Sequence, residues 1–162
     1  MVKNRKEGEQ SEKKPTLSHL NTEGSANMVD VSDKPISLRI AKAYGKISLN
    51  QEVIALIKED KIKKGSVLST AQIAGIMAAK RTWDVIPLCH SLILNKADVT
   101  LTLKEDHISA ESYISCNGNT GVEMEALHAV TVALLTVYDM CKAVDKNMVI
   151  SDIRLIEKWK KY

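Results

Sequence analysis

The segment VTLTLKEDHISAESYISC, from Val99 to Cys116, carries the clearest fold pattern in this chain. Apolar and polar residues alternate on both sides of Glu105-Asp106, which is typical of two half-buried strands joined by a tight turn. The residues from Thr120 to about Ala143 predict the longest helix. Its expected inner stripe consists of Ala126, Val130, Ala133, Val137 and Cys141. A hairpin followed by a long helix indicates a sheet with a helix on one face.

The flanking segments continue this pattern in both directions. A strand is predicted at 36–49, followed by a short helix from its cap residue Asn50 to about residue 60. A second helix is predicted from Ser66 to about Trp83, and a closing strand from Met148 to Leu155 with a bulge near Ser151-Asp152. Without the short helix, the order is β-α-β-β-α-β. This order predicts the α+β class with a ferredoxin-like fold, in which helices pack on one face of an antiparallel sheet.

The length of 162 residues suits one domain. Residues 1–16 are predicted to form a disordered polar tail, and residues 17–162 a single domain that becomes ordered near Met28. The net charge is +3, and the five bases and three acids of residues 1–16 leave +1 for the remainder. A nearly neutral domain with 4% aromatic residues argues against a nucleic-acid partner, which requires a positive field or stacking surfaces.

The three cysteines, Cys89, Cys116 and Cys141, are widely spaced and form no CxxC pair. This spacing disfavours a disulfide scaffold or a zinc site and favours a reducing, cytoplasmic location. No run approaches the ~18 apolar residues of a membrane span, and the N-terminus lacks the apolar core of a signal peptide. We therefore expect no membrane partner.

The long predicted helix carries acids at both ends. At its start, Thr120-x-x-Glu123 matches a capping box, which gives Glu123 a structural explanation. Glu125 has no capping role, and a solvated surface acid is its plainest interpretation. At the other end, Asp139 and Lys142 are spaced i, i+3 and can form an exposed ion pair. The apolar neighbours of Asp139 instead predict partial burial, which would make the pair a proton-transfer couple.

Weaker candidates lie outside the long helix. His90 follows Cys89 in a predicted loop, where a structural histidine is more common than a catalytic one. Lys64-Gly65-Ser66 precedes a helix and can bind phosphate oxygens, although a solvated basic face is the default interpretation. Gly118-x-x-Gly121 is a weak match to an RNA-binding loop. The histidines show no metal-ligand spacing.

Distance limits how the two ends of the long helix can act together. Glu125 and Asp139 are fourteen residues apart, or about 21 Å along a helix that rises ~1.5 Å per residue. Either the chain has two sites, or a second subunit brings one end to the other. The second alternative predicts a symmetric oligomer with its active site at an interface.

Three longer segments, together with Met28-Val29-Asp30-Val31, resemble a known enzyme family. They are AAKRTWDVIPLCH from Ala78 to His90, TGVEMEAL from Thr120 to Leu127 and YDMCKAV from Tyr138 to Val144. Over roughly residues 17–158 the chain resembles the cyclic pyranopterin monophosphate synthases of molybdenum cofactor biosynthesis. It departs from the family at Ser91, where a proline usually follows Cys-His.

The resemblance implies a lyase that converts a cyclised dihydro-GTP to cyclic pyranopterin monophosphate and releases pyrophosphate. It also implies a homohexamer, built as a trimer of dimers, with active sites between subunits. Asp139 corresponds to the catalytic acid/base residue, and Lys142 forms with it a couple suited to proton transfer. The resemblance assigns the following residues to substrate binding: Lys64, Lys80, Leu88, Cys89, His90, Glu123, Met124, Glu125 and Lys158.

Cofactors and two other functions remain to be weighed. No tightly bound cofactor is expected, and Mg²⁺ bound with the substrate triphosphate is left open because no carboxylate cluster has clear metal spacing. A non-catalytic nucleotide- or RNA-binding module would explain the GxxG turn and the lysines, but the nearly neutral domain opposes it. A structural oligomer is the third interpretation, in which Asp139 and Lys142 form only an ion pair.

Overall fold

The computed structural model describes residues 23–162, so the predicted tail at 1–16 lies outside the described residues. The helices and strands follow one another in the predicted order, with one additional short helix. They are β1 (Ser37–Ser48), α1 (Gln51–Lys58), α2 (Val67–Lys80), α3 (Thr82–Val85), β2 (Leu94–Leu103), β3 (His107–Gly118), α4 (Glu123–Cys141) and β4 (Ile150–Lys161).

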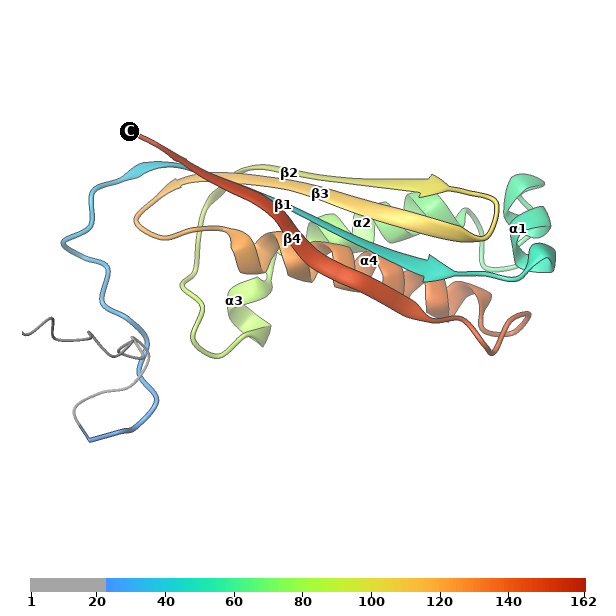
Figure 1. Cartoon of the computed structure of the whole chain (residues 1–162), viewed down its shortest axis with the longest axis horizontal. Coiled ribbons are helices and arrows are strands. Elements are labelled where there is room, and N and C mark those ends of the chain that lie inside the picture. The colour runs from blue at the N-terminus through green and yellow to red at the C-terminus, as the bar shows by residue number, and fades with distance from the viewer. Residues whose placement is uncertain (1–22) are drawn as a thin grey trace, which may run out of the picture.

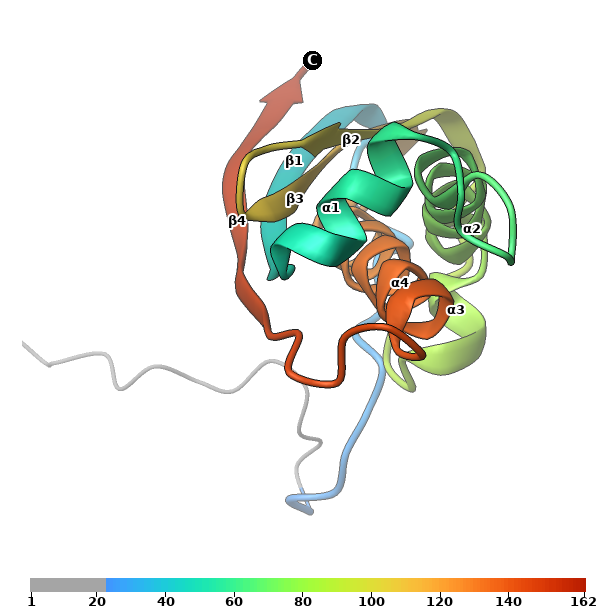
Figure 2. The same ribbon diagram turned by 90° about the vertical axis from the view of Figure 1, so that its right-hand side faces the viewer.

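The four strands form one antiparallel sheet in the order β2-β3-β1-β4. Helices α2 and α4 lie on the same face of this sheet, and α1 lies near one end of it (Figure 1). Seen along the helices, the sheet curves around α4 (Figure 2). This strand order and the one-sided helices confirm the predicted α+β, ferredoxin-like architecture.

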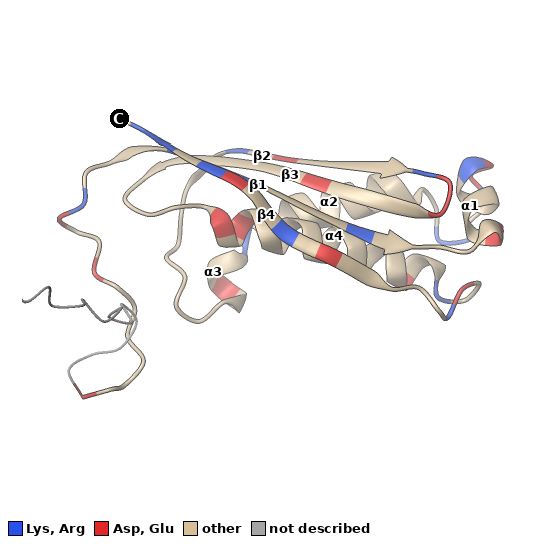
Figure 3. Ribbon diagram, in the orientation of Figure 1, with Lys and Arg blue, Asp and Glu red and all other residues tan. Residues whose placement is uncertain are grey.

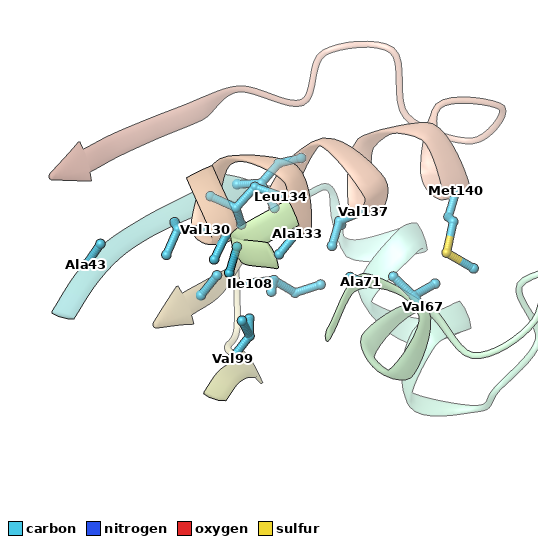
Figure 4. Close-up of a cluster of buried hydrophobic side chains, with 14 of the residues drawn as sticks. Ala43, Val67, Ala71, Val99, Ile108, Val130, Ala133, Leu134, Val137 and Met140 are labelled. Carbon is cyan, nitrogen blue, oxygen red and sulfur yellow. The ribbon is translucent and has the colours of Figure 1, made fainter. Parts of the chain in front are cut away.

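The core lies between the sheet and the helices (Figure 4). All five residues of the predicted inner stripe of α4 are fully buried, because their spacing places them on one helix face. Helix α2 packs closely against α4, since a Cβ on Gly75 would come 2.8 Å from the carbonyl oxygen of Ala129. By length and composition α4 could span a membrane, but half of its apolar window is buried in the protein, as in the core helix of a globular domain.

The predicted helix boundaries need two corrections. The second helix does not continue to Trp83; it ends at Lys80, and Thr82 starts α3 while its hydroxyl donates to carbonyl oxygens at the end of α2. The prediction of a capping box at the start of α4 is also wrong. Val122 occupies the cap position without a side-chain hydrogen bond, and Glu123 is the first helical residue. The predicted cap of α1 is confirmed, because the Asn50 side chain accepts from the Val53 amide at 2.9 Å.

Strand β4 is longer than predicted and contains two irregularities. The first matches the predicted bulge, since Asp152 has a φ of 56° and the pairing with β1 shifts there. The second shift lies near Ile156 and was not predicted. Each bulge adds one residue, so Lys158 pairs with Ala41, a fully buried residue that faces the helices. The first bulge alone would turn Lys158 away from the helices, and the second reverses that change, so Lys158 lies on the face of the sheet that carries the helical layer.

Candidate active site

A cavity of about 320 Å³ lies at the start of α4. Three parts of the chain line it: an N-terminal segment, the loop between α3 and β2, and the turn that leads from β3 into α4. Six of the predicted substrate-binding residues meet here: Leu88, Cys89, His90, Glu123, Met124 and Glu125. The size is within the range for small-molecule sites. The fold therefore unites three of the four segments that carry the family resemblance.

Glu125 is the buried acid of this cavity. Its surface is only 4% exposed, so the interpretation as a solvated surface acid is wrong. The loop after α3 covers the first turn of α4 at this point, which periodicity within the helix could not indicate. Burial raises the pKa of Glu125 to about 7, and the nearby charge of Glu123 adds to the rise. Glu125 can therefore exchange a proton near neutral pH.

Cys89 and His90 enter the cavity from the loop after α3. Burial, followed by the charge of Glu125, raises the pKa of the Cys89 thiol. A raised pKa disfavours the thiolate, which agrees with the rejection of a Cys-His nucleophile pair. His90 Nε2 lies 2.9 Å from the carbonyl oxygen of Val29. A carbonyl only accepts, so Nε2 carries the hydrogen and Nδ1 of a neutral ring is left to accept from a ligand.

Lys158 and Glu123 form an ion pair of 2.8 Å beside this cavity. Burial alone would raise the pKa of Glu123, but the hydrogen bond from Lys158 and one to its own backbone lower it overall. Gly121 permits this arrangement, because a Cβ there would overlap the Glu123 carboxylate. A second cavity, of about 280 Å³, is also lined by Gly121 and Glu123. Its other lining residues include Arg39 and Lys158. The charged end of the site is therefore continuous with the cavity of Glu125.

Asp139 lies at the opposite end of α4, between two lysines. Lys64 Nζ is 2.8 Å from Oδ2, and Lys142 Nζ is 2.7 Å from Oδ1. The hydrogen bonds from Lys142 and Lys64 lower the pKa of Asp139 to about 2. The predicted partial burial is wrong for the single chain, since the side chain is 57% exposed. Its apolar neighbours Val137 and Cys141 point into the core, and Asp139 points outward.

The predicted site residues thus form two separate clusters. The cavity cluster lies at the α3 end of α4, and the Lys64–Asp139–Lys142 cluster at the end near α1 (Figures 1 and 3). Lys80 is exposed at the end of α2 and lines neither the cavity of Glu125 nor the adjoining one. Within residues 23–162, no group of three or more His, Cys, Asp or Glu side chains is placed to hold a metal ion.

Sequence reasoning missed two basic residues near the cavity. Lys34 lines its wall, and Arg39 lines the adjoining cavity. Arg39 donates to the carbonyl oxygens of Gly118 and Asn119 at 3.4 and 3.2 Å, which fixes the turn before α4. Arg39 is one of several polar residues that alternate with apolar ones in its strand, and Lys34 lies in a segment without periodicity. Neither position carries a pattern that could have identified it.

A ferredoxin-like domain whose acids and lysines gather at the two ends of one helix has the features of an enzyme for a small anionic substrate. The profile of the MoaC family matches residues 28–160, and the chain belongs to this family. It is 52% identical over 142 residues to the cyclic pyranopterin monophosphate synthase of Peptoclostridium acidaminophilum, covering 88% of this chain and 90% of the relative. It is 54% identical over 144 residues to the enzyme of the same name from Heliobacterium modesticaldum (strain ATCC 51547 / Ice1), covering 88% and 91%.

Proposed function

We propose that this chain is a lyase that converts a cyclised dihydro-GTP to cyclic pyranopterin monophosphate, with release of pyrophosphate, in molybdenum cofactor biosynthesis. Membership of the MoaC family and the names of two relatives support the reaction. The geometric observation that carries the proposal is the contrast between two carboxyl groups. Glu125 is buried in a cavity with a pKa raised to about 7, and Asp139 lies between two lysines with a pKa lowered to about 2.

The complete site is proposed to form between subunits of a homohexamer, built as a trimer of dimers. Each chain presents a cavity at one end of α4 and a cationic cluster at the other. If two chains align their α4 helices in opposite directions, the start of one helix meets the end of the other. The exposed apolar side chains of Ile73, Met77 and Leu135 on α2 and α4 support such a contact, since a second copy would bury them.

The lysines are proposed to hold the phosphates. A nucleoside triphosphate carries about four negative charges near neutral pH, and ammonium groups bind such oxygens through charge-assisted hydrogen bonds. Lys64, Lys142 and Lys158 each form an ion pair with a carboxylate. Substrate phosphates would bind these ammonium groups together with the carboxylates or in their place. The same cations would stabilise the charge that develops on the departing pyrophosphate.

The carboxyl groups are proposed to move protons. Rearrangement of the purine-derived rings to a pterin requires protons to be added and removed in several steps. Two carboxyl groups with widely separated pKa values can divide acid and base roles. Glu125 would gain and lose a proton near neutral pH, and Asp139, which is ionised at that pH beside Lys142, would act as a base that accepts a proton. Leu88, Cys89, His90 and Met124 would enclose the ring system around Glu125.

Three further points remain predictions. Substrate binding by Lys80 requires a subunit contact that brings its exposed side chain to a cavity. Binding of Mg²⁺ with the triphosphate would rely on the phosphate oxygens for ligands. The cytoplasmic location rests on the free cysteines, two of which are buried.

The RNA-binding alternative is less well supported than the enzyme. On the strands, Lys42, Lys46 and Lys96 are paired with Glu157, Asp152 and Asp98. The ammonium groups of Lys42 and Lys96 also lie near the ring of Tyr113. These three lysines and their three acidic partners carry no net charge together, whereas a nucleic-acid backbone is attracted by a surface with a net positive charge.

Incubation with the cyclised dihydro-GTP tests the proposed function. The expected result is stoichiometric release of pyrophosphate together with a fluorescent pterin product. A purified chain that releases no pyrophosphate, but binds RNA with a steep dependence on salt, would favour the binding module instead.

A further inference from the structure

Residues 29–34, which we call the strap, form one wall of the Glu125 cavity through Val29, Val31 and Lys34. The strap has a defined local conformation. Asp30 Oδ1 accepts from the backbone amide of Ser32 at 2.9 Å and from its hydroxyl at 2.6 Å. The amide of Lys34 donates to the carbonyl oxygen of Val31 at 3.1 Å. These bonds form a compact turn, which determines where the Lys34 side chain leaves the backbone.

Two side chains from distant parts of the chain fasten the strap. Asn119 Nδ2 donates to the carbonyl oxygen of Val31 at 3.0 Å, and His90 Nε2 donates to that of Val29 at 2.9 Å. Asn119 is itself held in place, because Arg39 donates to its carbonyl oxygen at 3.2 Å. The turn before α4 and the strap are thus joined through one asparagine side chain. Loss of that side chain would release the strap near Lys34.

Lys34 differs from the lysines of the two clusters. Lys64 and Lys142 are paired with Asp139, and Lys158 with Glu123. For Lys34 the structure contains no ion pair with any of residues 23–162. It is the one Lys or Arg that lines the cavity within that range. An unpaired ammonium at the rim of a cavity that also holds two acids is suited to an incoming anion.

We propose that Lys34 binds an anionic group of the substrate and that Asn119 is a positioning residue, which places Lys34 by fastening the strap. The proposal rests on the proposed function for the identity of the substrate. It adds a cation to Lys64, Lys142 and Lys158, which the proposed function assigns to the phosphates. It also explains why Asn119, at the start of the β3–α4 turn, contacts Val31 in a segment about ninety residues away.

A double-mutant cycle separates contact from positioning. Lys34→Ala should raise KM for the cyclised dihydro-GTP about 10- to 100-fold, because a hydrogen bond to a charged group is lost, and should lower kcat less. Lys34→Arg should restore most of the affinity, since it keeps the positive charge. Asn119→Ala should raise KM less than Lys34→Ala does. In the double variant KM should match that of Lys34→Ala, because Asn119 has no lysine left to position.

Binding of inorganic tripolyphosphate provides a second readout that does not depend on turnover. Its Kd should rise in Lys34→Ala and Asn119→Ala in the same order as KM. Asn95→Ala is the matched control, since it removes a 2.7 Å bond from the Asn117 amide at the same end of the sheet and touches neither strap nor cavity. Its KM and Kd should be those of the wild type. Urea unfolding of each variant shows that it is folded.

Several outcomes would overturn the proposal. An unchanged KM and Kd in Lys34→Ala would exclude the contact, and this exposed side chain can be removed without a risk to folding. Additive effects of the two substitutions would exclude the positioning role of Asn119. If the wild type releases no pyrophosphate but binds tripolyphosphate in a Lys34-dependent way, the proposed function fails and the anion site stands. If it does not bind tripolyphosphate at all, the anion site fails.

Discussion

The two ends of α4 carry carboxyl groups with opposite properties. Glu125, in the first turn, is 4% exposed and forms no ion pair with any of residues 23–162. Asp139, in the last turn, is exposed and lies between Lys64 and Lys142. The pKa of Glu125 is raised to about 7, whereas that of Asp139 is lowered to about 2. One helix therefore holds a carboxyl group that titrates near neutral pH and a carboxylate that is ionised there and can accept a proton.

This contrast shows which electrostatic effect dominates. The helix dipole alone would favour a negative charge at the start of α4 and disfavour one at its end. The pKa shifts of Glu125 and Asp139 have the opposite signs. Burial outweighs the dipole at Glu125, and two close ammonium groups outweigh it at Asp139. Substitutions at one end of α4 at a time can test this contrast.

The largest effect is expected from Asp139→Asn, which removes the charge between the two lysines. Turnover should fall by about 10²- to 10⁴-fold, the usual contribution of a general acid or base. Pyrophosphate release under saturating substrate measures the loss. Asp98→Asn is the matched control, because Asp98 is also exposed and is paired at 2.7 Å with Lys96 on the sheet. A folded Asp139→Asn protein with wild-type turnover would contradict the catalytic role.

Glu125→Gln should change the pH profile as well as the rate. The amide has nearly the shape of the protonated carboxyl but cannot exchange the proton, so turnover should fall by about 10²-fold. The wild-type kcat profile should contain a limb with a pKa of about 7, and that limb should be absent from the variant. The same limb in both proteins would assign the titration to another group.

The same substitution should increase stability at alkaline pH. The pKa of Glu125 is higher in the folded chain than in the unfolded chain, so the unfolded state loses its proton first as the pH rises from about 4.5 to 7. The Glu125 carboxyl therefore contributes less to stability above pH 7 than below pH 4.5, by at most about 3 kcal/mol. Urea unfolding should show Glu125→Gln to be the more stable protein at pH 8, with the advantage disappearing near pH 4. Equal stability at pH 8 would mean that the carboxylate is not desolvated.

The smallest effect is expected at the exposed cluster. Lys64→Ala should raise the pKa of Asp139 from about 2 toward its ordinary value of 3.8, while Lys142 keeps part of the shift. The lowered pKa stabilises the fold above pH 4, and this contribution is lost as the pH falls through about 2. An NMR titration of the Asp139 carboxyl measures the change. Equal midpoints in variant and wild type would show that Lys64 does not contribute.

Periodicity predicted the parts of the fold that depend on neighbours in sequence. The alternation in Val99–Cys116 and the inner stripe of α4 correspond to the sheet and the core helix, because each reflects burial of one face. Periodicity gave no correct prediction where residues distant in sequence determine the position or burial of a side chain. Burial of Glu125 requires the loop after α3, and the position of Lys158 requires the second bulge of β4. The resemblance to the family named both residues without indicating these causes.

Mixed oligomers test the central claim that both ends of α4 serve one site formed by two chains. Glu125→Gln and Asp139→Asn chains are each expected to be nearly inactive. When they are unfolded together and refolded in equal amounts, a site needs an intact Glu125 from one variant and an intact Asp139 from the other. Random pairing then restores about a quarter of the wild-type turnover. Activity no higher than that of the two variants refolded separately would contradict a shared site.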